Sequence, residues 1–350
     1  MLDLSPIRAE LAAQYDLSPS LAAAEATRHI HARMARVMPF PDWAVYAPYV
    51  IAIERLKRER NAVVLAHNYM TPEIYHGIAD VVGDSLQLAI RATEVEAEVI
   101  VQCGVHFMAE TSKILNPAKT VLMPDLEAGC SLAESITPAG IAEMRARFPG
   151  APVVSYVNTT AAVKAASDIC CTSSNALQIV EAMDSDTVIM TPDQYLAKNV
   201  AAQSTKRVVW WEGSCIVHER YTPEDLRDYR RHEPGVAIIA HPECPPEVVA
   251  EADYTGSTSG IIDWVTRHRP AKAMLVTECS MAANIADALP EVDFVRPCNA
   301  CPYMKKITLE KVLWSLHSMT GQVEVDPAVA VPARRAVQRM IDLSRQLAGG

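Results

Sequence analysis

Short apolar runs alternate with longer amphipathic patterns over most of the chain after Asn61. Strands of a parallel sheet are buried on both faces and read as continuous apolar runs, whereas crossover helices carry one apolar face. The runs "NAVVLAH" (61–67) and "AEVIVQC" (97–103) have the character of such strands. This alternation predicts βαβ units and an α/β fold with mainly parallel sheets.

The pattern repeats with a period of about 85 residues, and the last apolar run of each repeat ends at a cysteine. These cysteines are Cys130, Cys215 and Cys301, which are 85 and 86 residues apart. The predicted strands lie within 61–69, 81–85, 97–104, 119–130, 151–159, 168–174, 186–192, 206–215, 235–243, 253–259, 272–278 and 292–301. A fixed period indicates one unit copied three times. We therefore expect three repeated αβα sandwich units, each with a four-stranded, mainly parallel sheet, around a pseudo-threefold axis.

Two helix starts support this register. "TPAGIAEMRARFPG" (137–150) and "TPEDLRDYRRHEPG" (222–235) both follow a repeat cysteine, and each begins with Thr-Pro and ends with Pro-Gly. Threonine is a good N-cap, and proline suits the first helical position. The predicted organisation is an N-terminal helical segment (1–60), α/β units at 61–148, 149–233 and 234–318, and a C-terminal helical tail (319–350).

Composition limits the function classes. The 350 residues carry a formal charge of −10, and half of them are apolar. Since no Lys/Arg run tracks along a face, nucleic acid is not an expected partner. No run approaches the ~18 apolar residues of a membrane span, and the N-terminus does not read as a signal peptide. We expect a cytoplasmic protein, in which the nine cysteines are thiols or metal ligands rather than disulfides.

Polar residues recur where the predicted strands end. Strand carboxyl ends are the usual ligand sites of α/β sheets, and hydroxyls before helices favour bound anions. Taken singly, these histidines read as structural residues and these serines as plain N-caps; their shared repeat phase predicts a common pocket. The residues are His67, Tyr69, Ser85, Tyr156, Asn158, Ser173, His241, Glu243 and Thr258.

The three repeat cysteines predict a metal centre. A structural zinc usually has four ligands, often in local CxxC pairs, but the only CxxC here is Cys298–Cys301. Three thiolates from distant parts of the chain suit a [4Fe–4S] cluster with one iron free of protein thiolate, which can act as a Lewis acid. Cys298 lies outside the repeat phase and is either a bystander or a disulfide partner of Cys301 when the cluster is lost.

From about Asn61 to Val312 the chain resembles the quinolinate synthase family of de novo NAD biosynthesis. The motifs are "LAHNYM", "GDSLQLA", "GVHFMAET", "YVNTTAAVKAASDICCTSSNA", "HPEC", "TGSTSGII" and "CPYMKKITLEKV". The resemblance implies an enzyme that condenses iminoaspartate with dihydroxyacetone phosphate to quinolinate, phosphate and water. It also implies a [4Fe–4S] cluster and, as a functional partner, an aspartate-oxidising enzyme.

The resemblance assigns roles residue by residue. It gives cluster ligation to Cys130, Cys215 and Cys301. The catalytic residues that it implies are Tyr69, Tyr156, Glu243 and His241. The substrate-binding residues that it implies are His67, Ser85, Asn158, Ser173, His241 and Thr258.

Two other readings of the residues stay open. One is a non-catalytic cluster or zinc protein, such as a redox sensor that uses Cys298 and Cys301; a sensor would not need the polar residues at the strand ends. The other is a cluster-dependent hydro-lyase that acts on a hydroxy acid. A radical S-adenosylmethionine enzyme is disfavoured because its CxxxCxxC pattern is absent.

Overall fold

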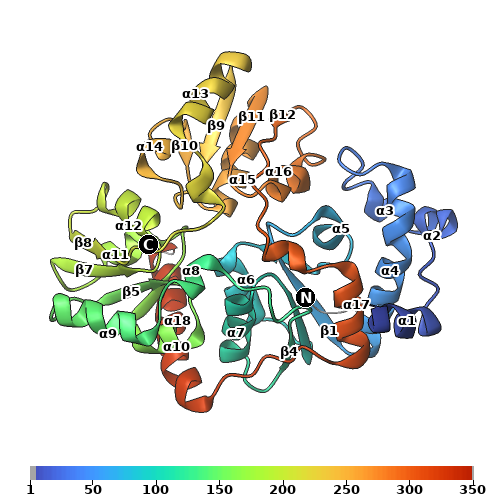
Figure 1. Cartoon of the computed structure of the whole chain (residues 1–350), viewed down its shortest axis with the longest axis horizontal. Coiled ribbons are helices and arrows are strands. Elements are labelled where there is room, and N and C mark those ends of the chain that lie inside the picture. The colour runs from blue at the N-terminus through green and yellow to red at the C-terminus, as the bar shows by residue number, and fades with distance from the viewer. Residues whose placement is uncertain (1–4, 349–350) are drawn as a thin grey trace.

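The computed structural model describes residues 5–348 and contains three four-stranded sheets grouped around a common centre (Figure 1). All the strand pairs are parallel, so the predicted α/β class with three repeated units is confirmed. The strands are β1 Ala62–His67, β2 Val81–Gly83, β3 Val99–Cys103, β4 Thr120–Leu122, β5 Val153–Tyr156, β6 Ile169–Cys171, β7 Thr187–Thr191, β8 Arg207–Trp210, β9 Val236–Ala240, β10 Tyr254–Thr255, β11 Lys272–Val276 and β12 Asp293–Val295.

Each sheet has the same strand order: β2-β1-β3-β4, β6-β5-β7-β8 and β10-β9-β11-β12. The first strand of a unit therefore lies between the second and the third. The chain passes from the first strand to the second on one side and then crosses over to the third strand on the other side. Such a switch point opens a crevice at the carboxyl ends of the strands. The three repeats thus place three equivalent crevices, one in each sheet.

Helices connect the strands. They are α1 Ser5–Gln14, α2 Leu21–Ala26, α3 Arg28–His31, α4 Phe40–Glu59, α5 Pro72–Tyr75, α6 Ser85–Ala92, α7 His106–Leu115, α8 Ser131–Glu134, α9 Pro138–Arg147, α10 Ala161–Ala166, α11 Ala176–Glu181, α12 Gln194–Ala201, α13 Pro223–His232, α14 Pro246–Val249, α15 Thr258–His268, α16 Ser280–Ile285, α17 Leu309–Ser318 and α18 Pro327–Ala348, with 3₁₀ turns η1 His218–Arg220 and η2 Met304–Lys306.

The two predicted Thr-Pro helix starts are α9 and α13. Thr137 and Thr222 are their N-cap residues, and proline follows in the first turn of both helices. Gly150 and Gly235, which end the two segments, have φ of +83° and +80°, a conformation that favours glycine. The same residue types therefore start and stop the equivalent helix in two units, although only the Thr222 side chain makes a capping hydrogen bond.

The chain ends pack onto different units. In the N-terminal segment, α4 packs against α17 and β1, and Trp43 is fully buried and donates its indole N–H to the Thr27 hydroxyl. At the other end, α18 crosses back to pack on α10 and β6 of the second unit, as Figure 1 shows. The helical character predicted for both ends is present in the described residues.

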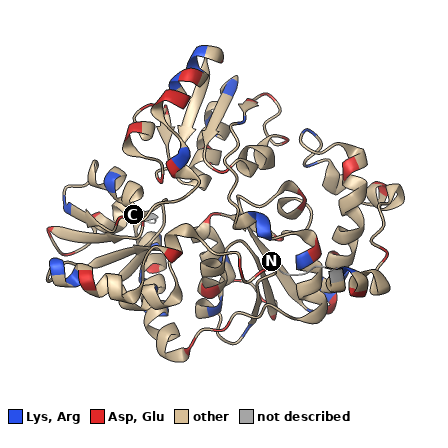
Figure 2. Cartoon of the chain, in the orientation of Figure 1, with Lys and Arg blue, Asp and Glu red and all other residues tan. Residues whose placement is uncertain are grey.

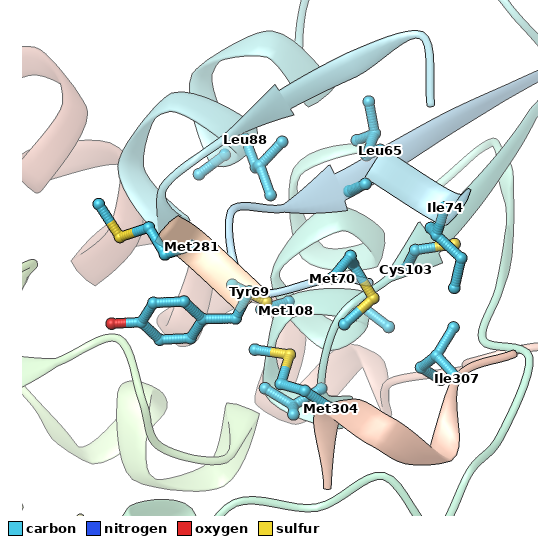
Figure 3. Packing of buried hydrophobic residues seen from close by; sticks show 14 of the residues in the cluster. Leu65, Tyr69, Met70, Ile74, Leu88, Cys103, Met108, Met281, Met304 and Ile307 are labelled. Carbon is cyan, nitrogen blue, oxygen red and sulfur yellow. The ribbon is translucent and has the colours of Figure 1, made fainter. Parts of the chain in front are cut away.

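Apolar side chains fill the space between the sheets and helices, and methionine is prominent near the centre. Met70, Met108 and Met304 pack together there, and Tyr69 lays its ring against them with its hydroxyl pointing out of the cluster (Figure 3). Charged residues of both signs share the outer helices, as on α13 (Figure 2). Among residues 5–348, no helix has the length and apolar character to cross a bilayer.

Candidate functional site

A central pocket lies where the carboxyl ends of the three units face one another. All of the site residues predicted from the sequence line it: His67, Tyr69, Ser85, Cys130, Tyr156, Asn158, Ser173, Cys215, His241, Glu243, Thr258 and Cys301. Their convergence follows from the shared strand order, since each unit contributes the same edge of its sheet. The chemical role of each residue stays a prediction, and its contacts limit which roles are possible.

The three repeat cysteines have one common local structure. Each sulfur precedes a single helical turn, namely α8, η1 or η2. The backbone N–H groups two and three residues further on face the sulfur in every case: Leu132 and Ala133 at Cys130, Val217 and His218 at Cys215, Tyr303 and Met304 at Cys301. Such donors stabilise a thiolate, and all three cysteines are free. This donor set fits a cluster held by three sulfurs.

Cys298 has a different environment from Cys301. It is disulfide-bonded to Cys279, at the start of α16, with a Cα–Cα distance of 4.8 Å. The expectation that all the cysteines are thiols or metal ligands is therefore wrong for Cys279 and Cys298, whereas a Cys298–Cys301 disulfide after cluster loss stays a prediction. Cys279 and Cys298 meet although they are 19 residues apart in sequence, because they follow β11 and β12, which are neighbouring strands.

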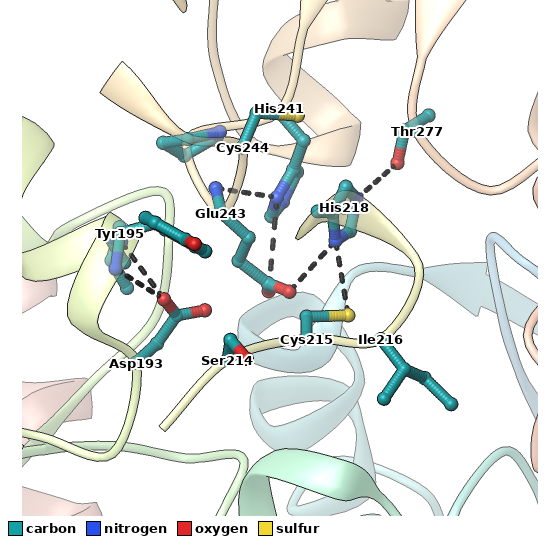
Figure 4. A network of polar contacts seen from close by, with 12 residues as sticks. Asp193, Tyr195, Ser214, Cys215, Ile216, His218, His241, Glu243, Cys244 and Thr277 are labelled. Atoms are coloured by element: carbon teal, nitrogen blue, oxygen red, sulfur yellow. Dashed lines mark hydrogen bonds and ion pairs between the residues drawn. The ribbon is translucent and has the colours of Figure 1, made fainter. Parts of the chain in front are cut away.

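Glu243 is the centre of the polar network in the pocket (Figure 4). Its Oε1 accepts a hydrogen bond from the Tyr156 hydroxyl at 2.6 Å, and its Oε2 lies 3.0 Å from His218 Nδ1. Burial alone would raise the pKa of this carboxyl, but His218, His241 and the hydrogen bonds outweigh burial and hold it well below its usual range. Glu243 is therefore a carboxylate at neutral pH.

Two histidines are held as neutral imidazoles. The backbone N–H of Tyr69 donates to His67 Nδ1 at 3.2 Å, and that of Glu243 donates to His241 Nδ1 at 3.3 Å. Burial lowers the pKa of His67 to about 4 and that of His241 to about 3. Because Nδ1 accepts in both rings, Nε2 carries the proton and is a donor in the pocket.

Ser85 and Thr258 are not the N-caps of their helices. Asp84 caps α6 and Ser257 caps α15, so the reading of Ser85 as a plain N-cap is wrong and its hydroxyl is not used for capping. Thr258 Oγ1 accepts from the Asn68 amide at 2.9 Å, which leaves its own proton for another acceptor. Asn158 Oδ1 is buried with no protein partner, as expected of an atom that waits for a ligand.

Four residues near the site were missed by the sequence analysis: His218, Thr277, Glu278 and Lys305. His218 lines the pocket and stacks on His241 at 4.7 Å between ring centres. Its position three residues after Cys215, one helical turn from a predicted cluster ligand, could have indicated that it lies in the pocket. The other three lie at or beyond the end of β11 and in η2, where no repeated motif marks them.

Comparison with known proteins matches the sequence of this chain to one family model. The sequence model described as "Quinolinate synthetase A protein" matches residues 51–342. The chain is 58% identical to quinolinate synthase of Sinorhizobium fredii over 330 residues, covering 94% of this chain and 92% of that protein. It is 59% identical to quinolinate synthase 1 of Mesorhizobium japonicum over 312 residues, covering 89% and 96%. Agrobacterium fabrum quinolinate synthase is 58% identical over 314 residues, covering 90% and 91%.

The match spans all three units and every residue of the pocket. The chain belongs to the quinolinate synthetase A protein family, a family of enzymes.

Proposed function

We propose that the protein condenses iminoaspartate with dihydroxyacetone phosphate to give quinolinate, phosphate and two waters, with a [4Fe–4S] cluster as cofactor. Family membership supports the activity. The observation that carries the proposal is the central pocket, where three sulfurs with matching N–H donors meet Glu243, the phenols of Tyr69 and Tyr156, and three imidazoles.

Cys130, Cys215 and Cys301 would hold the cluster. When bound, its iron without a protein thiolate supplies a Lewis acid for a substrate oxygen that leaves as water. The chain's own contribution here is to present three sulfurs from three units to one side of the pocket, each beside two backbone donors.

Substrate binding must rely on neutral donors, because no Lys or Arg is among the residues that line the pocket. The Nε2–H groups of His67 and His241 suit the carboxylates of iminoaspartate. The hydroxyls of Ser85 and Thr258 lie in the first turns of α6 and α15, where the helix dipole favours an anion such as phosphate. Asn158 offers an unpaired acceptor oxygen, which suits an N–H or O–H of the substrate.

Proton transfer falls to Glu243 and the two tyrosines. Because Glu243 is unprotonated at neutral pH, it can accept a proton between C–C and C–N bond formation. Burial and the neighbouring Glu243 raise the pKa of Tyr69 and Tyr156 well above the usual value, so both phenols keep their protons at neutral pH. They can therefore donate a hydrogen bond or a proton to the substrate.

The test is product formation by protein purified without oxygen. Iminoaspartate hydrolyses in water, so an aspartate-oxidising enzyme would supply it in the assay, as we expect one to do in the cell. Protein that holds about four irons per chain should form quinolinate only when dihydroxyacetone phosphate is also present. The proposal is wrong if such loaded protein forms none.

A further inference from the structure

A buried asparagine of the second unit holds the turn that carries Glu243 in the third unit. Asn199 lies in α12, and its Nδ2 donates to the carbonyl oxygens of Pro242 at 2.8 Å and Cys244 at 3.0 Å. These two residues stand directly before and after Glu243. Carbonyl oxygens only accept, so the amide nitrogen rather than the amide oxygen must face them. Asn199 therefore fixes the backbone on both sides of Glu243 from across a unit boundary.

Asn284 makes the same pair of contacts at the next junction. It lies in α16 of the third unit, and its Nδ2 donates to the carbonyls of Asn68 at 3.0 Å and Met70 at 2.8 Å in the first unit. Tyr69 stands between these two residues, and its own carbonyl accepts from Lys305 Nζ at 3.0 Å. The third unit thus binds three consecutive carbonyls of the turn that carries Tyr69.

The two asparagine bridges are equivalent in the repeat. Asn199 and Asn284 are 85 residues apart, each lies in the helix after the third strand of its unit, and they are 7% and 3% exposed. Helix α12 packs against α14 of the third unit, and α16 packs against α5 of the first unit (Figure 1). The turns are alike too, since their last residues donate backbone N–H groups to the histidine carbonyls that open them, at 2.9 Å for Met70 and 3.0 Å for Cys244.

In the described part of the chain, the remaining junction has no such asparagine. The position 85 residues before Asn199 is Ile114 in α7, which is buried and apolar. The corresponding turn carries Asn158, and the next carbonyl, that of Thr159, accepts from Lys164 Nζ within the same unit. The asparagine bridge therefore occurs where the turn carries a proposed proton-transfer residue, and not where it carries a proposed substrate-binding residue.

We propose that Asn199 and Asn284 are positioning residues, which hold Glu243 and Tyr69 in place for proton transfer. The inference rests on the proposed function, because it requires these two side chains to exchange protons with the substrate. Proton transfer needs the two heavy atoms within about 2.6–3.2 Å of each other, and a displacement of about 1 Å can cost about 100-fold in rate. Neither asparagine lines the central pocket, so each acts only through the turn that it bridges.

The experiment is a double-mutant cycle in full-length protein purified anaerobically, with rates expressed per loaded cluster. Leucine keeps much of the shape of asparagine and removes its amide. Asn284→Leu is therefore made both in the parent and in Tyr69→Phe. Asn199→Leu is made in the parent and in Glu243→Gln, because it should act through the other proton-transfer residue.

In the parent background, Asn284→Leu and Asn199→Leu should each lower kcat by about 10–100-fold, with little change in KM, because the displaced group acts in the transition state. In Tyr69→Phe, Asn284→Leu should change the rate by less than about twofold, because the hydroxyl that it positions is already absent. Asn199→Leu should likewise have little effect in Glu243→Gln. A merely structural defect would instead lower the rate by the same factor in both backgrounds.

Two further variants complete the design. Asn116→Leu is the matched control, since this buried asparagine donates to the Ser112 carbonyl at 3.1 Å within its own unit; its rate should stay within about twofold of the parent. Asn284→Ser keeps one donor and goes through the same cycle, so the test does not depend on the leucine variant folding. It should lose about three- to tenfold in the parent and almost nothing in Tyr69→Phe.

Two results would overturn the inference while leaving the proposed function intact. One is a folded Asn284 or Asn199 variant whose rate is within about twofold of the parent. The other is a loss that is as large in Tyr69→Phe, or in Glu243→Gln for Asn199, as it is in the parent. Absence of quinolinate from the loaded parent protein would instead refute the proposed function itself.

Discussion

Glu278→Gln should destabilise the segment that carries Cys301. The Glu278 side chain is fully buried at the end of β11, and its Oε1 accepts from Lys305 Nζ at 2.8 Å and from the Cys301 backbone N–H at 3.3 Å. Its Oε2 accepts from the Ser280 N–H at 2.8 Å. One carboxylate thus joins β11, the start of α16 and the loop that presents the third sulfur.

The magnitude follows from these bonds. An amide keeps one acceptor oxygen and puts a donor in place of the other, so one buried N–H faces another donor. Such an unsatisfied pair costs about 1–3 kcal/mol. Loss of the ion pair with Lys305, whose side chain is 25% exposed, adds about 1 kcal/mol. We expect a decrease of about 2–4 kcal/mol in the free energy of unfolding.

The assay is urea unfolding followed by tryptophan fluorescence, with iron content measured on the same anaerobic preparations. Glu233→Gln is the matched control, because Glu233 pairs with Lys272 at 2.7 Å in the same unit but both side chains are about one-third exposed. That control should cost at most about 1 kcal/mol. Iron content should also fall in Glu278→Gln alone. Equal stability and equal iron in the two variants would refute this reasoning.

Three other predictions follow from the pocket. Glu243→Gln should keep its iron and lose ~10²–10⁴-fold in kcat, because an amide cannot take a proton; a rate within a few-fold of the parent would remove Glu243 from the chemistry. Cys301→Ser should lose both iron and activity, since serine is a poor ligand for iron, whereas Cys298→Ser should keep most of both; equal iron loss would show that the repeat selected the wrong sulfur. Stability should fall as the pH drops from about 6.5 toward 4, because His67 and His241 stay neutral in the fold, with pKa of about 4 and about 3, but gain protons on unfolding. Urea titrations across this range should show a smaller slope for His67→Gln, and an unchanged slope would contradict the neutral assignment.

Much of the fold and the pocket could be predicted from the sequence, because both depend on local signals that repeat. The first and third strands of each unit are mainly apolar runs, and the last strand of each unit leads to a cysteine, so equivalent positions could be aligned without coordinates. Parallel sheets then bring their carboxyl ends together. For this reason all the predicted site residues lie in one pocket.

What the sequence did not reveal depends on contacts between units. Thr277 contacts Tyr69 and His218 across 208 and 59 residues, and a buried threonine at a strand end has no distinctive local pattern. Lys305 and Glu278 lie in the same unit, but they pair between η2 and the segment after β11, and no local pattern marks that pairing. The N-cap roles of Asp84 and Ser257 were also missed, because each has a hydroxyl neighbour that could equally cap a helix.

The central claim is that the three sulfurs hold a cluster on which the reaction depends. The most direct measurement follows iron, acid-labile sulfide and quinolinate formation on one anaerobic preparation, before cluster removal, after it and after reconstitution. The account predicts about four irons and four sulfides per chain at the start, a rate that falls in proportion to cluster loss, and recovery on reconstitution. Full activity in the cluster-free protein would contradict it.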